Sequence, residues 1–116
     1  MKRLIWVGSS LEDLRSFPDE VKRTVGFALY LAQMGGKHPD AKPLRGFGDA
    51  GVLEVVDNTR GGTYRVVYTV RFLTAIYVLH AFQKKARRGI ATPKQDIELI
   101  RARLRRAQEH DKRQKG

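Results

Sequence analysis

β-branched and aromatic side chains dominate three segments in the middle of the chain. These are residues 52–56 (VLEVV), 63–70 (TYRVVYTV) and 74–82 (TAIYVLHAF), in which strong helix formers are scarce. Between the first two lies DNTRGG, whose Asp, Asn and paired glycines tolerate the positive φ of a tight turn. The pattern predicts three consecutive antiparallel strands joined by hairpin turns.

The register of these strands decides which side chains meet, because successive residues point to opposite faces of a sheet. If the first turn is centred on residues 59 and 60, Glu54 lies opposite Arg65. If the second turn is centred on residues 72 and 73, Arg65 lies opposite His80. We therefore expect a row of three polar residues across three strands, with Lys84 at its exit. An odd number of residues in either turn would break this row.

The same register predicts which side chains belong to the core. The face away from the row is apolar, and we expect it to be buried; it carries Leu53, Val55, Tyr64, Val66, Tyr68, Tyr77, Leu79 and Ala81. The row face carries apolar neighbours around the polar residues, namely Val52, Val56, Val67, Val78 and Phe82.

The segments before the strands predict one more strand and two helices. Residues 2–7 favour a short strand that ends at Gly8, and the spacing of Ser9 and Ser10 from acidic residues predicts a short helix. A second helix is expected over residues 18–34, with a buried stripe at spacings of three and four: Val21, Val25, Ala28, Leu29 and Ala32. Residues 35–51 contain five glycines and two prolines, which predicts a loop without regular structure.

A last helix is predicted to begin at Thr92, where a capping residue precedes Pro93. Its apolar stripe is Ile97, Ile100, Leu104 and Ala107. The exposed side is expected to carry Arg101, Arg103, Arg105 and Arg106, and residues 108–116 are expected to fray. Together the elements indicate an α+β fold: an N-terminal strand and helical hairpin packed on a small antiparallel sheet, with a C-terminal helix.

Length and composition place limits on the class of protein. The chain has 116 residues, which indicates one domain over residues 1–116. Cysteine is absent, which excludes disulfides and thiolate metal sites and fits a reducing compartment. No apolar run approaches the roughly 20 residues that cross a bilayer, and the opening MKRLIWVG is too short for a signal peptide. We expect a soluble, cytoplasmic protein.

The positive charge is concentrated at the C-terminal end. The net charge is +11, and residues 82–116 hold twelve Lys or Arg against four Asp or Glu, while residues 1–81 hold eleven against eight. Such a field favours a polyanionic partner, with nucleic acid ahead of an anionic membrane surface. The alternative is a basic helix that is merely solvated.

The predicted polar row contains the side chains that metal-independent RNA cleavage requires. Arg65 is suited to holding a phosphate, His80 to moving a proton, and Lys84 to stabilising the extra charge of the transition state. Each also has a structural interpretation: Arg65 as a cross-strand partner of Glu54, His80 as a core histidine, and the basic segment after residue 82 as a solvated turn. Sequence motifs for a metal, a cofactor or a serine nucleophile are missing.

Two segments also resemble a known family of proteins. The run LEVVDNTRGGTYRVVYTV, followed by YVLHAFQKKARRGIATPKQDIELIRARL, resembles the phage-derived, HigB-like branch of the RelE/HigB toxin superfamily. The resemblance extends from about Trp6 to Ala107, and TYRVVYTVRF, VLHAFQKK and GIATPK are its most specific pieces. It implies the toxin half of a type II toxin–antitoxin pair with a RelE-like fold.

For many members of this superfamily the activity is cleavage of mRNA in the ribosomal A site. By that resemblance Arg65 corresponds to the arginine that grips the scissile phosphate, Glu54 to the acidic strand residue and His80 to a proton carrier. Lys84 and Lys85 correspond to a basic pair after the last strand. Ala86 stands where many relatives have Ser or Thr, so this chain lacks the hydroxyl of those relatives.

The resemblance also implies partners and leaves other activities open. The expected RNA-binding residues are Lys85, Arg87, Arg88, Arg60, Lys42 and Arg45. The expected partners are mRNA, the ribosome and a HigA-like antitoxin with a helix-turn-helix domain; no metal and no small-molecule cofactor is expected. Because one fold supports several activities, a toxin that inhibits a protein such as DNA gyrase is the alternative, and a non-toxic phage protein that binds nucleic acid is a third.

Overall fold

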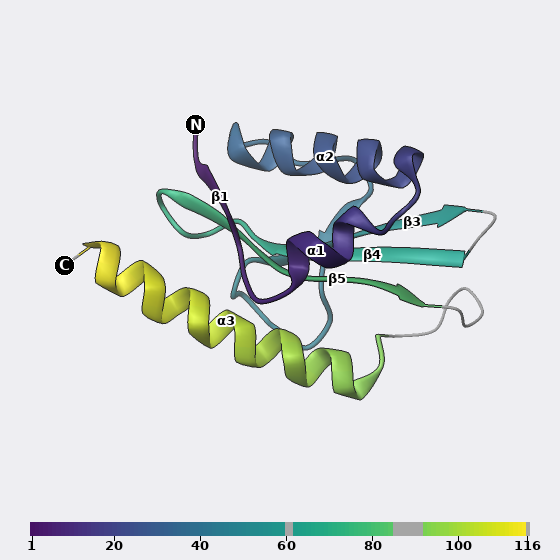
Figure 1. Cartoon of the computed structure of the whole chain (residues 1–116). Coiled ribbons are helices and arrows are strands. Elements are labelled where there is room, and N and C mark those ends of the chain that lie inside the picture. Colours follow the sequence, from purple (N-terminus) through teal and green to yellow (C-terminus); the bar gives the residue numbers. More distant parts are fainter. Residues whose placement is uncertain (60–61, 85–91, 116) are drawn as a thin grey trace.

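A five-stranded sheet separates two helical layers (Figure 1). A computed structural model of the chain describes residues 1–59, 62–84 and 92–115. The elements follow in the order β1 (Arg3–Trp6), α1 (Ser10–Arg15), α2 (Asp19–Gln33), β2 (Ala41–Pro43), β3 (Val52–Thr59), β4 (Gly62–Thr69), β5 (Ala75–Lys84) and α3 (Lys94–Lys115). The predicted α+β class and element order are confirmed.

The strands lie in the order β1-β5-β4-β3-β2, so the first strand returns to pair with the last one. β1 is parallel to β5, and every other neighbouring pair is antiparallel. β2 lies within residues 35–51, where the sequence predicts no regular structure. That prediction is wrong over three residues, because Ala41–Pro43 pairs along the edge of β3.

The two faces of the sheet are covered by different helices. α2 buries the predicted stripe of Val21, Val25, Ala28, Leu29 and Ala32 on one face, where Leu14 and Phe17 also pack. On the other face α3 packs Ile100, Leu104 and Ala107 against residues of β4 and β5. Both faces therefore carry a hydrophobic core, and the face that holds the polar residues is partly covered by α3.

The register of the two hairpins differs from the prediction by two residues. Arg65 lies opposite Val56 and Phe82, while Glu54 and His80 both lie opposite Val67. Glu54 and His80 are thus diagonal neighbours of Arg65, and the predicted straight row is wrong. A two-residue shift keeps each side chain on its predicted face, so Glu54, Arg65 and His80 still share one.

A β-bulge in β5 changes the faces of three residues. Val67 pairs with His80 and Tyr68 pairs with Val78, which leaves Leu79 without a partner in the ladder. Beyond the bulge Val78 packs with α2, whereas Tyr77 and Leu79 pack with α3. The sequence predicts the reverse for these three residues, because alternation in a regular strand cannot reveal an inserted residue.

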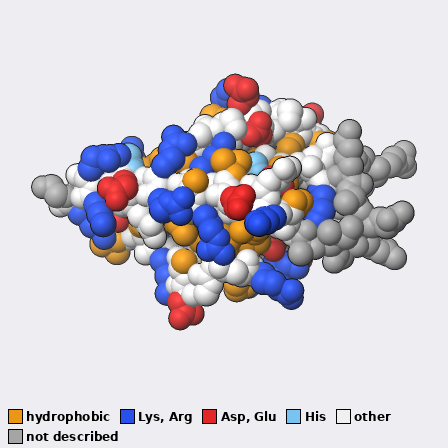
Figure 2. Space-filling view, turned by 90° about the horizontal axis from the view of Figure 1, so that it is seen from below, with side chains coloured by type: hydrophobic (Ala, Val, Ile, Leu, Met, Phe, Trp, Pro, Cys, Tyr) orange, Lys and Arg blue, Asp and Glu red, His pale blue; other side chains and the backbone are white. Residues whose placement is uncertain are grey.

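α3 exposes basic side chains on its side of the molecule. Figure 2 looks at this side and shows Lys and Arg side chains with hydrophobic side chains between them. Arg101, Arg105 and Arg106 are exposed as predicted, but Arg103 is buried. The helix is regular to Lys115, through the segment that the sequence predicts to fray.

Candidate functional site

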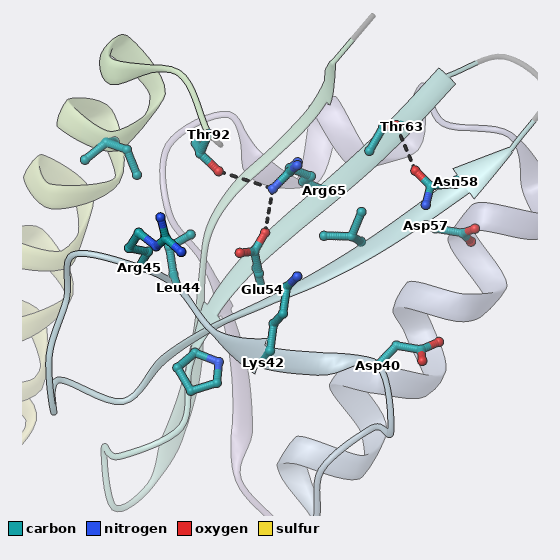
Figure 3. Close-up of a pocket in the computed structure, with 13 residues that line it drawn as sticks. Asp40, Lys42, Leu44, Arg45, Glu54, Asp57, Asn58, Thr63, Arg65 and Thr92 are labelled. Atoms are coloured by element: carbon teal, nitrogen blue, oxygen red, sulfur yellow. Dashed lines mark hydrogen bonds and ion pairs between the residues drawn. The ribbon is translucent and has the colours of Figure 1, made fainter. Parts of the chain in front are cut away.

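A cleft of about 900 Å³ opens beside β2 and β3 and reaches the start of α3 (Figure 3). β2 forms one wall, and its pairing sets Lys42 opposite Glu54, so that the two side chains share the cleft face. Arg45 extends this wall. Arg65 lies on β4, the strand on the other side of β3 from β2. The complete lining is Asp40, Lys42, Pro43, Leu44, Arg45, Glu54, Val56, Asp57, Asn58, Thr63, Arg65, Thr92 and Ile97.

Arg65 and Glu54 form a buried ion pair at the floor of this cleft. Arg65 Nη1 donates to Glu54 Oε1 over 2.8 Å, and the residues are 9% and 6% exposed. The same nitrogen donates to Thr92 Oγ1, just before α3, over 3.4 Å. A guanidinium held from two sides is a fixed cation, which is what binding a phosphate in one orientation requires.

Lys84 ends β5 close to Arg65. It lies opposite Thr63 and is buried. Burial, followed by the charge of Arg65, lowers the pKa of Lys84, and Asp96 opposes this shift. An ammonium with a lowered pKa releases its proton more readily than an ordinary lysine does, which suits a general acid.

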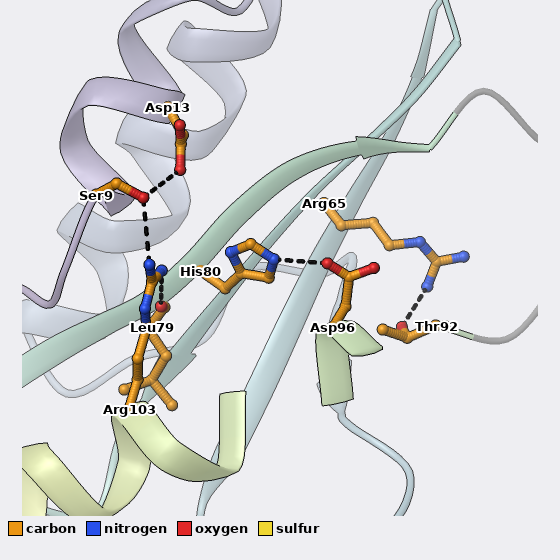
Figure 4. Close-up of polar contacts among 8 residues, drawn as sticks. All are labelled: Ser9, Asp13, Arg65, Leu79, His80, Thr92, Asp96 and Arg103. Atoms are coloured by element: carbon orange, nitrogen blue, oxygen red, sulfur yellow. Dashed lines mark hydrogen bonds and ion pairs between the residues drawn. The ribbon is translucent and has the colours of Figure 1, made fainter. Parts of the chain in front are cut away.

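His80 shares the face of Arg65 but lies under α3 (Figure 4). Its Nε2 lies 2.8 Å from Asp96 Oδ1, and its ring stacks on Phe82 with centroids 4.5 Å apart. Burial lowers the pKa of His80, and the hydrogen bond to Asp96 offsets part of the shift. The ring is therefore mainly neutral at pH 7, and because a carboxylate only accepts, its proton is on Nε2.

Comparison with known proteins identifies the family. The model of the phage-derived Gp49-like protein family matches residues 12–105. The chain belongs to this family. No curated protein matches it.

The Gp49-like chain has the fold of the RelE toxin. It superposes on the isolated E. coli RelE toxin with a TM-score of 0.55 and 17% identity, covering 88% of this chain and 98% of the toxin. A double arginine-to-alanine variant of E. coli RelE in the free state gives a TM-score of 0.54 and 16% identity, covering 90% and 96%. The predicted RelE-like fold and phage-derived family are thus confirmed.

The structure brings together only part of the predicted site. Lys42 and Arg45 line the cleft with Arg65 and Glu54, while His80 and Lys84 are not among the residues that line it. Lys84 lies opposite Thr63, which does line the cleft. The other predicted RNA-binding residues lie outside the described part of the chain, as does Ala86; they are Arg60, Lys85, Arg87 and Arg88.

Sequence reasoning missed two residues that join the site to α3. Thr92 is predicted only as a helix cap, yet it contacts Arg65, and Asp96 in the first turn of α3 bonds to His80. The cap motif at Thr92 fixes the helix start, but only the packing of α3 on the sheet shows what these side chains reach. Among the described residues no three His, Asp or Glu side chains gather as a metal site, and no helix there could span a bilayer.

Proposed function

We propose that this Gp49-like protein is the toxin of a type II toxin–antitoxin system and cleaves mRNA on the ribosome. The observation that carries the proposal is the cleft itself, in which Lys42, Arg45 and the fixed Arg65 lie around Glu54. The cleft also holds the carboxylates of Asp40, Glu54 and Asp57, of which Glu54 is paired with Arg65. Its cationic side chains suit an RNA backbone, because the phosphates supply most of the attraction of RNA to protein. The RelE-like fold supports the same proposed function.

The proposed reaction is attack of a ribose 2′-oxygen on the adjacent phosphorus, with cleavage of the bond to the 5′-oxygen. We assign Arg65 to the phosphate, where it would stabilise the added negative charge. Glu54 would accept the 2′-hydroxyl proton, and Lys84, with its lowered pKa, would protonate the leaving 5′-oxygen. The products are a 2′,3′-cyclic phosphate and a 5′-hydroxyl.

His80 remains a candidate proton carrier within this proposal. Its Nε2 donates to Asp96 and the ring is outside the cleft lining, so any transfer requires this contact to rearrange. His80→Gln keeps an N–H that can donate to Asp96 but cannot titrate. Full activity of this variant at every pH would make His80 structural.

The proposed partners follow from the proposed activity. They are mRNA, the ribosome and a HigA-like helix-turn-helix antitoxin, and the site of action is the cytoplasm. Lys42 and Arg45 would track the RNA backbone on the β2 side of the scissile phosphate. Arg60, Lys85, Arg87 and Arg88 stay predicted RNA-binding residues.

The test is expression in cells with transcript 5′ ends mapped after a short induction. Because Arg65→Ala alone would leave the buried Glu54 unpaired, the variant of choice is Arg65→Met with Glu54→Gln. We expect this double variant and Lys84→Ala to relieve growth arrest and abolish new codon-phased ends. Arg23→Ala, an exposed arginine on α2, is the matched control and should remain toxic.

Two results would reject the assignment. If the folded double variant and Lys84→Ala are fully toxic, the cleft is not the site. If the wild-type chain arrests growth and induces a DNA-damage response without new RNA ends, inhibition of DNA gyrase replaces RNA cleavage.

A further inference from the structure

The outer side of α2 exposes large apolar side chains. Phe27, Tyr30 and Met34 are 54%, 49% and 57% exposed, which makes them three of the six large hydrophobic residues that are exposed among the described residues. Their spacings of three and four place them on one side of the helix, opposite the buried stripe. In Figure 1 this side is covered by none of the described elements. We call it the α2 face; with the exposed Arg23 and Gly26 it has five members.

Gly26 lies in the middle of the α2 face, beside Phe27. Glycine is the poorest helix former apart from proline, so its place inside a helix calls for a reason. The described part of the chain supplies none, because Gly26 does not have a positive φ and a Cβ there would meet no atom within 4 Å. The missing side chain instead leaves a flat place on the outer surface, where a second helix can approach closely.

The charges of α2 suit a second copy of the same chain. Asp19 and Glu20 make the first turn acidic, Arg23 follows one turn later, and no later residue of α2 is acidic. A parallel pair of helices would set each of these charges against the same charge of the other copy, which is repulsive. An antiparallel pair moves the acids to opposite ends and brings Arg23 over the ring of Tyr30 of the second copy, where a cation can contact the aromatic face.

We propose that the chain forms a two-fold symmetric dimer in which the α2 faces of two copies pack antiparallel. In such a pair each side of a helix meets the same side of the other helix, so Gly26 approaches Gly26 of the second copy. When Arg23 faces Tyr30 of the second copy, the two Gly26 residues are offset by about 1.5 Å along the helix axes and the two Arg23 residues by about 10 Å. The proposal rests on the α2 face and not on the activity proposed for the cleft.

The composition of the α2 face disfavours a polyanion as its ligand. Arg23 is its only cation, and Asp19 and Glu20 precede it. The basic side chains of α3 lie beyond the sheet, on the opposite side of the molecule (Figures 1 and 2). Each copy carries a net charge of +11, so repulsion between two copies is smallest when they meet through α2.

The proposed dimer is weak and leaves both clefts open. Its three half-exposed apolar side chains offer roughly 100 Å² each per copy, which places the interface below the roughly 1,600 Å² of a standard stable complex. We expect a Kd on the order of 100 μM. α2 packs on the face of the sheet away from α3, and Arg65 and Glu54 lie on the α3 face, so the dimer does not cover them.

Sedimentation velocity of the purified chain, from about 10 μM to about 1 mM, tests the proposal. We expect a monomer that becomes a dimer with rising concentration. Gly26→Gln should weaken the dimer at least about tenfold, because its side chain holds the helices apart. The same substitution should not lower the midpoint of urea unfolding, since glutamine is a better helix former than glycine.

A second variant and its control test the apolar contacts. Phe27→Ser with Met34→Ser should weaken the dimer at least about tenfold. Leu73→Ser removes a side chain that is 76% exposed in the turn between β4 and β5, and it should leave the Kd within about twofold of wild type. Circular dichroism checks that each variant is folded.

Salt separates apolar packing from association by charge. Raising the salt concentration from about 0.1 M to about 0.5 M should tighten the dimer at least about twofold, because it screens the repulsion between two basic chains. Association through charge, including bridging by RNA, would weaken under the same change.

Cross-linking through single cysteines tests the antiparallel register. The chain has no cysteine, so any disulfide between copies reports the introduced residue. Gly26→Cys should cross-link on mild oxidation, because its Cα and that of the second copy lie within the roughly 4.4–6.8 Å that a disulfide spans. Arg23→Cys, offset from its own copy by about 10 Å along the axis, should cross-link at least about tenfold more slowly.

Four outcomes would overturn the proposal. A wild-type chain that stays monomeric at about 1 mM would leave the α2 face to a helix of another protein. Equal dimerisation of the wild type and Gly26→Gln would place the contact elsewhere on the surface. A dimer that weakens as salt rises would be held by charge. Equal cross-linking rates of Gly26→Cys and Arg23→Cys would reject the antiparallel packing.

Discussion

At the scale of single residues, the buried Arg103 shows how a local irregularity creates a need for a polar side chain. The bulge leaves Leu79 without a ladder partner, and Arg103 Nη1 donates to its carbonyl oxygen over 2.9 Å. Nη2 donates to Ser9 Oγ over 3.2 Å, so one guanidinium joins α3 to β5 and to the start of α1 (Figure 4). A Cβ on Gly8 would lie 2.7 Å from this group, which together with a φ of +58° makes glycine necessary there.

This arrangement predicts a stability effect that an exposed arginine would not produce. Arg103→Met should lower the free energy of unfolding by about 2–3 kcal/mol, because it leaves the buried Leu79 carbonyl without its donor. Arg105→Met, at an exposed position of the same helix, should change it by less than about 0.5 kcal/mol. Urea unfolding of both variants measures the difference, and equal effects would contradict the role given to Arg103.

At the scale of elements, the sequence predicted the helices and the long strands but missed the features that depend on tertiary contacts. The stripe of α2 follows from spacing, and the three long strands follow from their β-branched and aromatic composition. The predicted ends at residues 56 and 82 are wrong, because β3 continues to Thr59 and β5 to Lys84. Leu79 could not be recognised as a bulge because residues 75–79 are all apolar, so no change in a polar–apolar alternation marks the inserted residue. Arg103 could have been suspected, since it follows Ile100 by three residues and so borders the buried stripe. The cleft residues Lys42 and Arg45 were predicted to lie in a loop, while the place of Lys42 opposite Glu54 depends on the short strand β2.

The C-terminal turns of α3 are held by contacts that the sequence did not reveal. Tyr77 bonds to His110, and the buried Asp111 pairs with Lys115 over 3.2 Å. We predict that Tyr77→Phe costs about 1 kcal/mol and speeds amide hydrogen exchange in residues 109–115. Tyr30→Phe, at an exposed position of α2, is the control. Unchanged exchange in Tyr77→Phe would show that packing alone holds these turns.

At the scale of the whole molecule, the lowered pKa of His80 links folding to pH. Its ordinary value is 6.5, and burial in the folded state lowers it. The unfolded chain therefore binds the proton more readily, so this residue reduces the free energy of unfolding as pH falls through about 6.5, until the folded state also becomes protonated.

This linkage gives a prediction for unfolding experiments in urea. From pH 7.5 down to about 5.5, wild-type stability should fall with a slope of at most about 1.4 kcal/mol per pH unit from His80. His80→Gln should remove that part of the slope, because glutamine does not titrate. The same slope in both proteins would contradict the pKa assigned to His80.

The cleft lies at the β2 end of the sheet and is closed on one side by the start of α3. Thr92, just before this helix, contacts Arg65, and Ile97 in its first turn lines the cleft. The proposed reaction depends on this cleft.

Single-turnover cleavage of mRNA on purified ribosomes, with a codon in the A site, measures this reaction. We expect the wild type to cleave the mRNA to a 2′,3′-cyclic phosphate. We expect a loss of at least about 10²-fold in Arg65→Met with Glu54→Gln, and no loss in Arg23→Ala. Failure of the wild type to cut, or equal rates for the wild type and the folded double variant, would contradict the proposed reaction.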